Sequence, residues 1–216
     1  MYKHFIKRAA DLIIAFIAAV MLIPVWLILS LLIVIDDRGS VFFVQKRVGK
    51  GKKLFPILKF RTMKTKTPHD TPTHLLSAPD QYITRVGRFL RKTSLDELPQ
   101  LFNIIAGQMA IVGPRPALWN QYDLIEERDK YGANDIRPGL TGLAQINGRD
   151  ELPIPEKARL DGEYARSVSL KTDISCILGT VSAVLRHRGV VEGGTGTLDK
   201  EKNDSGALPD NSGEKP

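Results

Sequence analysis

Residues 12–35, LIIAFIAAVMLIPVWLILSLLIVI, form an uncharged apolar run that decides how this chain must fold. One helix of this length would be about 36 Å long, enough to cross the ~30 Å hydrocarbon core of a bilayer with some tilt. The run is too long for a signal peptide, and no small-x-small cleavage site precedes Asp36 and Asp37. Because a small domain can rarely enclose so many apolar residues, the run predicts a segment inserted in a membrane.

Pro24 lies at the middle of this run, where its ring removes one backbone hydrogen bond and frees the carbonyl of Val20. Each half is about 18 Å of helix, too short to span a bilayer alone. Basic residues flank both ends, so the charge distribution does not select an orientation. Two interpretations stay open: a kinked helix that crosses the membrane, and two half-helices that enter and leave by the same leaflet. In the second, the Ile23 side chain offers no hydrogen bond to the backbone at the apex.

The composition of the whole chain is that of a globular protein. The 216 residues are 43% hydrophobic and 25% charged, with 31 Lys and Arg against 24 Asp and Glu and a formal net charge of +7. These fractions exclude collagen-like, fibrous and wholly disordered proteins, and the length fits one domain with appendages. The single cysteine, Cys176, excludes an intramolecular disulfide and indicates a reducing compartment.

The remaining pattern predicts a mostly helical domain with a small β component. Two short apolar strands are expected at 41–45 and 54–60, joined by a basic turn that contains glycine. Apolar spacing predicts helices over 82–92, 95–106, 118–131, 156–167 and 170–188. The polar, proline-containing segment 65–81 predicts a surface loop, and the segment from residue 193 onward, which lacks apolar periodicity, predicts a disordered tail.

The segment Ser94-Leu95-Asp96-Glu97 at the start of the 95–106 helix allows two interpretations. In a capping box, Ser94 is the N-cap and Glu97 reaches back to the free backbone N–H groups. Alternatively, the adjacent carboxylates of Asp96 and Glu97 serve a site where a polyphosphate meets Mg²⁺, one binding the metal and the other attacking phosphorus. Pro99 leaves little helix ahead of the acids and so places them at an exposed end, which weakens the first interpretation.

Many cations in the surrounding segments favour the phosphate interpretation, because arginines neutralise charge that develops on phosphoryl oxygens. These residues are Lys59, Arg61, Arg88, Arg91, Arg115, Arg137 and Arg149. Pro114 and Pro116 hold Arg115 on a restricted backbone, and the glycines at 139, 142 and 148 allow close approach to a ligand. The turn and the glycines fit a purely structural role equally well.

Several other kinds of site are excluded. The chain contains neither G-x-G-x-x-G nor a P-loop, and its four histidines lack metal-ligand spacing, so any metal should be a hard, oxygen-bound ion. The basic stretch from Lys46 to Lys66 follows a membrane segment, so attraction to anionic lipid explains it without nucleic acid.

Five stretches in order resemble the small monotopic phosphoglycosyl transferases of bacteria, or bacterial sugar transferases. They are YKHFIKRAADL, LKFRTM, SLDELPQLFNIIAGQM, IVGPRPAL and RPGLTGLAQINGR, and the resemblance covers residues 1 to about 192. It implies a re-entrant membrane hairpin over 1–38 that breaks at Pro24 and a compact catalytic α/β domain over 39–192 with membrane-surface helices. The predicted disordered tail, 193–216, lies beyond the resemblance. The catalytic domain is expected on the cytoplasmic face of the bacterial inner membrane.

The resemblance also implies roles for individual residues. Asp96 is expected to be the nucleophile and Glu97 its Mg²⁺-binding neighbour, with Lys59 and Arg115 near the phosphates and Arg149 lining the site. From the charge pattern, Arg88 and Arg137 are further candidates for phosphate binding. Family members often carry Ser before the hairpin proline, where this chain has Ile23.

The implied reaction is ping-pong: Asp96 attacks a UDP-sugar, UMP leaves, and polyprenyl (undecaprenyl) phosphate takes the phosphosugar. Two alternatives are direct displacement with the same substrates and a non-catalytic, membrane-anchored interaction protein. The expected partners are the UDP-sugar, polyprenyl phosphate and membrane lipid, but no nucleic acid. The pattern names neither the sugar nor the glycan pathway, and it leaves a homo-oligomer open.

Overall fold

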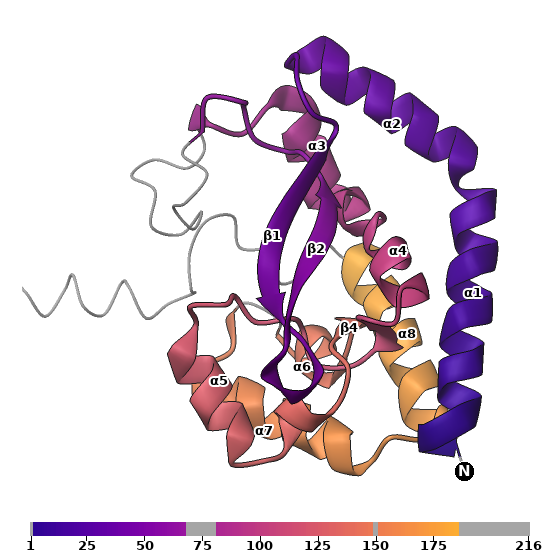
Figure 1. The fold of residues 1–216 in the computed structure, drawn as a ribbon, viewed down its shortest axis with the longest axis vertical. Coiled ribbons are helices and arrows are strands. Elements are labelled where there is room, and N and C mark those ends of the chain that lie inside the picture. Colours follow the sequence, from indigo (N-terminus) through magenta and orange to yellow (C-terminus); the bar gives the residue numbers. More distant parts are fainter. Residues whose placement is uncertain (1, 68–80, 149–150, 186–216) are drawn as a thin grey trace, which may run out of the picture.

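The structure, a computed structural model, describes residues 2–67, 81–148 and 151–185. It is mostly helical with a small sheet component, as the sequence predicts. Figure 1 shows α1 and α2 along the outer side of the molecule and the β1–β2 hairpin at its centre, with α4 between them and α5 and α7 at one end. The predicted tail and most of the predicted 65–81 loop lie outside the described residues.

The apolar run forms two helices, α1 (Lys7–Met21) and α2 (Ile23–Asp36), preceded by a π-helical turn, η1 (Tyr2–Ile6). They meet at Leu22 with a bend of 60°. The bend lies two residues before Pro24 because proline fits the first turn of α2, where its missing N–H has no helical partner. The carbonyl of Val20 accepts a hydrogen bond from the backbone at the Leu22 cap, so it is not left free.

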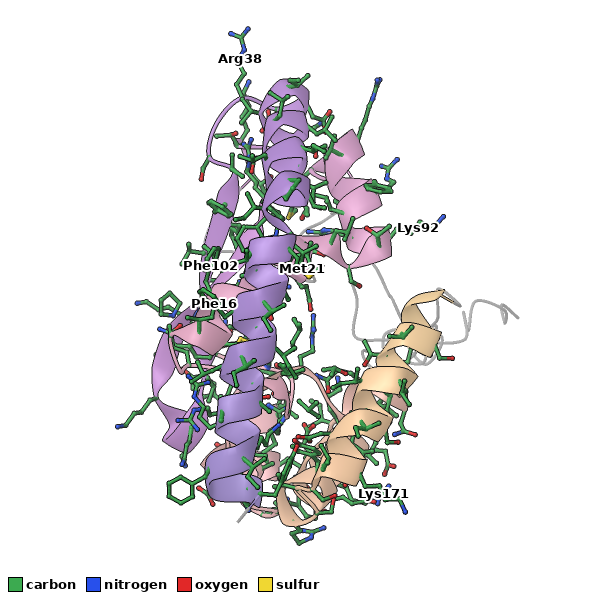
Figure 2. The ribbon with its side chains drawn as sticks, turned by 90° about the vertical axis from the view of Figure 1, so that its right-hand side faces the viewer. Phe16, Met21, Arg38, Lys92, Phe102 and Lys171 are labelled. Atoms are coloured by element: carbon green, nitrogen blue, oxygen red, sulfur yellow. The ribbon has the colours of Figure 1, made fainter. Side chains whose placement is uncertain are left out.

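Within the described ranges, no single helix is long and apolar enough to cross a membrane, whereas α1 and α2 together pass that test by length and composition. Most of their large apolar side chains are exposed. Figure 2 looks onto this outer surface, where Phe16 and Met21 project from α1. The inner side of α1 carries small buried residues, Ala15 and Ala19, which pack with β2 and α4 in one core cluster.

The two predicted strands form an antiparallel hairpin, β1 (Phe42–Val48) and β2 (Leu54–Phe60), joined through η2 (Lys50–Lys52). The first strand runs three residues further than predicted. Phe43 lies opposite Lys59 in this register, and Phe42 lies opposite Phe60 with their rings stacked. Strand β2 thereby brings Lys59 towards the centre of the molecule.

The expected helix over 95–106 is wrong as a single element. Helix α3 (Arg85–Thr93) ends at Ser94, a 3₁₀ turn η5 follows (Leu95–Glu97), and helix α4 covers only Gln100–Ile105. The chain breaks because Ser94 has a left-handed backbone, with φ 56°, and because Pro99 cannot donate a helical hydrogen bond. Asp96 and Glu97 therefore lie on a tight turn between two helices.

The sequence pattern did not predict a second sheet, in which β3 (Ala110–Val112) and β4 (Gly139–Thr141) pair in parallel. The remaining elements are α5 (Tyr122–Asp129), η6 (Ala133–Asp135), α6 (Leu143–Ile146), α7 (Ile154–Arg166) and α8 (Leu170–Leu185). They cover most of the predicted segments 118–131, 156–167 and 170–188. Helix α8 leaves Leu170, Ile174 and Leu178 exposed, as expected of an amphipathic helix.

Candidate active site

The Asp96–Glu97 turn is not a capping box. Ser94 ends α3 in the left-handed region and makes no side-chain cap hydrogen bond to the following turn. The Glu97 side chain instead contacts Lys59 on β2 and Arg115 on the loop after β3. The capping box suggested by Ser and Glu three residues apart is therefore wrong, because the Glu97 carboxylate binds cations that are distant in the sequence instead of the backbone N–H groups of its own turn.

Glu97 lies at the centre of this charged cluster and is only 7% exposed. Its Oε1 lies 3.0 Å from Lys59 Nζ and 2.8 Å from Arg115 Nη2, and its Oε2 lies 3.4 Å from Arg115 Nη1. A buried carboxylate needs such partners, because burial without them costs several kcal/mol. The two cations thus hold the Glu97 carboxylate in one orientation.

Asp96 has a different environment. Its Oδ2 lies 3.8 Å from Lys59 Nζ, beyond hydrogen-bond distance, and its side chain is mostly buried. Burial raises the pKa of Asp96, while Lys59, Arg115 and Arg91 oppose that rise and the charge on Glu97 adds to it. Within the described ranges, Asp96 therefore forms an ion pair with Lys59 but no side-chain hydrogen bond, which leaves its carboxylate oxygens available for attack on a substrate.

The structure distinguishes the two predicted arginines of α3. The charge of Arg91 opposes the rise in the pKa of Asp96 that burial causes. The Nε of Arg91 donates a hydrogen bond to Thr62 Oγ1 at 2.9 Å. Arg88, the candidate chosen from the sequence, is exposed, one helical turn earlier. The signal that favours Arg91 is its position at the end of α3, immediately before the turn with the two acids.

The other predicted cations lie elsewhere. Arg137 donates from Nε to the carbonyl of Gly107 at 2.9 Å, beyond the C-terminal end of α4, whereas the acidic turn precedes α4. Arg61 is buried and binds Asp37 Oδ2 at 2.8 Å, so it connects the end of β2 to the end of α2. Arg149 lies outside the described residues. The phosphate-binding roles of Arg88, Arg137 and Arg149 stay predictions.

The turn that carries Arg115 is held by the second sheet. Gly113 N donates to the carbonyl of Thr141, and Gly139 N donates to the carbonyl of Pro114, both at 2.8 Å. A Cβ on Gly139 would lie 2.1 Å from Gly113 N, and one on Gly142 would lie 2.1 Å from Gly113 O. These two glycines allow their own backbone to approach the backbone of Gly113 closely. The sequence alone had left open whether they serve the approach of a ligand instead.

Comparison with known proteins identifies the family of this chain. A family model described as "Bacterial sugar transferase" matches residues 2–187. The chain belongs to the bacterial sugar transferase family.

Three relatives illustrate the likeness. "Exopolysaccharide production protein ExoY" of Sinorhizobium fredii is 37% identical over 197 residues, which cover 85% of this chain and 87% of that protein. "Undecaprenyl-phosphate glucose phosphotransferase" of Komagataeibacter xylinus is 39% identical, with coverage of 84% of this chain and 36% of that protein. "Undecaprenyl-phosphate galactose phosphotransferase" of Salmonella typhimurium is 34% identical, covering 87% and 42%. This sugar transferase therefore corresponds to nearly all of the first protein and to part of the other two.

The donor set of the sugar transferase fits a hard cation. Within the part of the chain that the structure describes, no group of three or more His, Cys, Asp or Glu side chains is placed to hold a metal ion. Asp96 and Glu97 supply two carboxylates, and Mg²⁺ is commonly bound by one or two carboxylates together with substrate phosphates and water. The residues present thus fit Mg²⁺ bound with a substrate, but not a metal held by protein ligands alone.

Proposed function

We propose that this sugar transferase moves a sugar-1-phosphate from a UDP-sugar to polyprenyl phosphate, releases UMP, and forms a covalent aspartyl intermediate on Asp96. The observation that carries the proposal is the difference between the two carboxylates. Glu97 is hydrogen-bonded by Lys59 and Arg115, whereas Asp96, in the described part of the chain, forms only the longer 3.8 Å ion pair with Lys59. The names of two relatives, an undecaprenyl-phosphate glucose phosphotransferase and an undecaprenyl-phosphate galactose phosphotransferase, support the lipid substrate.

In the first half-reaction, an Asp96 carboxylate oxygen attacks the phosphorus that carries the sugar. A new P–O bond forms and the bond to the bridging oxygen breaks, so UMP leaves with that oxygen and the bonding electrons. In the second, an oxygen of polyprenyl phosphate attacks the same phosphorus. The bond to Asp96 breaks, which restores the carboxylate and completes a lipid-linked diphosphate sugar.

Lys59 and Arg115 have two tasks in this scheme. They orient Glu97, and their positive charges stabilise the negative charge that develops on the phosphoryl oxygens. Arg91 adds a third positive charge that acts on Asp96. Asp96 and Glu97 would hold Mg²⁺, which when bound neutralises diphosphate charge and thereby favours the approach of an anionic nucleophile.

The membrane proposal concerns α1 and α2, whose exposed apolar side chains give them a surface suited to lipid. We propose that the pair is re-entrant, so that residues on both sides of the hairpin lie at the cytoplasmic face of a bacterial inner membrane. The 60° bend at Leu22 supports this over a straight span, and the body packed against α1 would then meet a lipid-linked substrate at the membrane surface.

The decisive experiment combines Asp96→Asn with mass spectrometry of the protein mixed with UDP-sugar and Mg²⁺ but no lipid. The wild-type chain should gain the mass of one phosphosugar, and the variant, nearly isosteric and therefore folded, should gain none and release no UMP. UMP release that requires added polyprenyl phosphate, with no adduct in its absence, would instead indicate direct displacement. UMP release from the Asn variant at the wild-type rate would remove Asp96 as nucleophile. No release at any Mg²⁺ concentration, even with polyprenyl phosphate added, would favour the non-catalytic anchor.

A further inference from the structure

Strand β2 has one edge that β1 does not pair, and the side chain of Asn103 on α4 makes hydrogen bonds to it. Asn103, only 5% exposed, accepts a hydrogen bond at Oδ1 from Leu58 N at 2.9 Å. Its Nδ2 donates to the carbonyl of Pro56 at 2.8 Å and to Gln108 Oε1 at 2.6 Å. The amide therefore replaces a neighbouring strand, because it satisfies one donor and one acceptor of the β2 backbone together.

This contact joins the two segments that supply charged side chains to the candidate active site: strand β2, and the acidic turn with the helix α4 that follows it. Leu58 is followed directly by Lys59, which reaches both carboxylates of the acidic turn. Asn103 belongs to the helix that follows the same turn, and backbone hydrogen bonds from Leu98 to Leu95 and from Leu101 to Leu98 connect turn and helix without a gap. Residues 58 and 103 thus fix β2 and α4 relative to each other at one buried point.

We propose that Asn103 is a positioning residue for the transfer reaction, acting through Lys59. It holds β2 in the register with α4 that places Lys59 Nζ 3.0 Å from Glu97 and 3.8 Å from Asp96. This inference rests on the proposed function for its catalytic consequence, although not for the contact itself. A displacement of about 1 Å in a group that acts on the reacting atoms can reduce a rate by about 10²-fold.

The test is a double-mutant cycle in the full chain, with Asn103→Leu and Lys59→Met separately and together. The substrate is UDP-glucose or UDP-galactose, whichever the wild-type chain turns over. Asn103→Leu should lower kcat about 10- to 100-fold and change KM little, but should have almost no further effect once Lys59 is Met. A residue that merely supports the fold would lower the rate by the same factor in both backgrounds, and that outcome would overturn the proposal.

Two further variants keep the result interpretable. Gln108→Ala removes the third partner of the Asn103 amide and leaves both β2 contacts, so its kcat should stay near that of the wild type. If Asn103→Leu fails to fold, Asn103→Ser replaces it, since serine is too short to bridge both backbone groups and leaves room for water to satisfy them. Wild-type kcat in a folded Asn103→Ser variant would contradict the positioning role.

A measurement without turnover separates this inference from the proposed function. The Lys59 side chain is 16% exposed and paired, so an amine-reactive reagent should modify it slowly. In Asn103→Leu the modification of Lys59, followed by mass spectrometry, should accelerate while that of exposed Lys46 on β1 stays unchanged. A wild-type chain that turns over no UDP-sugar would defeat the proposed function, whereas unchanged Lys59 labelling would defeat the role of Asn103.

Discussion

The guanidinium of Arg115 binds the carboxylate of Glu97 with both terminal nitrogens, Nη2 lying 2.8 Å from Oε1 and Nη1 3.4 Å from Oε2. Lysine keeps the charge but cannot make this forked contact. We expect Arg115→Lys to lower UMP release roughly 100-fold, comparable to the loss of one preorganised donor in an active site. Steady-state UMP release measures the effect.

The matched control for this variant is Arg159→Lys. Arg159 binds Glu156 through two nitrogens at 2.7 and 2.9 Å on the exposed surface of α7, far from the acidic turn in sequence. Its replacement should leave UMP release unchanged, because exposed ion pairs contribute little. Equal losses in the two variants would contradict a specific role for the Arg115 fork.

Gly139 should tolerate no side chain. A Cβ there would lie 2.1 Å from Gly113 N and 2.5 Å from the carbonyl of Thr141, and both are backbone atoms that cannot move independently. We expect Gly139→Ala to lower the free energy of unfolding by about 3 kcal/mol, at the upper end of overpacking effects. Gly51→Ala is the comparison, since no atom lies within 4 Å of its Cβ and only its φ of 63° is unfavourable, at about 1 kcal/mol. Thermal unfolding that ranks the two variants equally would refute the tight contact.

The rate of adduct formation should fall at acidic pH. Burial raises the pKa of Asp96, and a protonated carboxyl is a poor nucleophile, so the rate should decline as the pH falls through a value above the usual range of aspartate. Because Lys59 lowers the pKa of Asp96, Lys59→Met should move this decline to still higher pH and also reduce the maximum rate. Single-turnover kinetics across a pH series measure both, and an acidic limb that moves to lower pH in the variant would contradict the assignment.

Cys176 should be unreactive in the folded chain. Its side chain is fully buried, and burial raises the pKa of the thiol to about 11, so almost no thiolate exists at pH 8. A colorimetric thiol reagent should therefore detect no free cysteine in the native protein and one after denaturation. Rapid reaction of the native protein would show that α8 opens readily around Cys176.

The re-entrant arrangement predicts that both ends of the helix pair stay on one side of the membrane. In a Cys176→Ser background, single cysteines introduced as Lys3→Cys and Ser40→Cys should both be shielded from a thiol reagent that acts only outside the cell. Permeabilised cells provide the control, because both positions should then react. Labelling of either position in intact cells would indicate a helix that crosses the bilayer.

Much of the fold follows from local sequence pattern. The apolar run and the β1–β2 hairpin were predicted from continuous apolar stretches and a turn between two of them. The amphipathic helix α8 was predicted from spacing, because burial on one face imposes a period on its residues. The parallel pair β3–β4 was not predicted, since each strand has only three residues and its partner lies 29 residues away in the chain. Such short strands carry too few residues to display an alternation.

The sequence identified some, but not all, of the residues that the structure brings to the candidate site. Asp96, Glu97, Lys59 and Arg115 were expected together and the structure brings them together. Arg91 rather than Arg88 lies near Asp96, and Arg137 lies past the other end of α4. A count of positive charges cannot rank arginines, because the side chain that reaches the acids depends on how its helix is rotated and where that helix ends.

The sequence by itself determined that this chain has an uncharged apolar run with a proline at its middle, a basic hairpin and two adjacent acids, because those features depend on residue type and spacing. Only the tertiary structure decided between a capping box and a charged cluster at residues 94–97. The capping box needs contacts within four residues, whereas Glu97 is held by Lys59, 38 residues away, and by Arg115, 18 residues away. Those contacts exist only after β2, α4 and β3 have packed, so no local pattern could rank them above a cap.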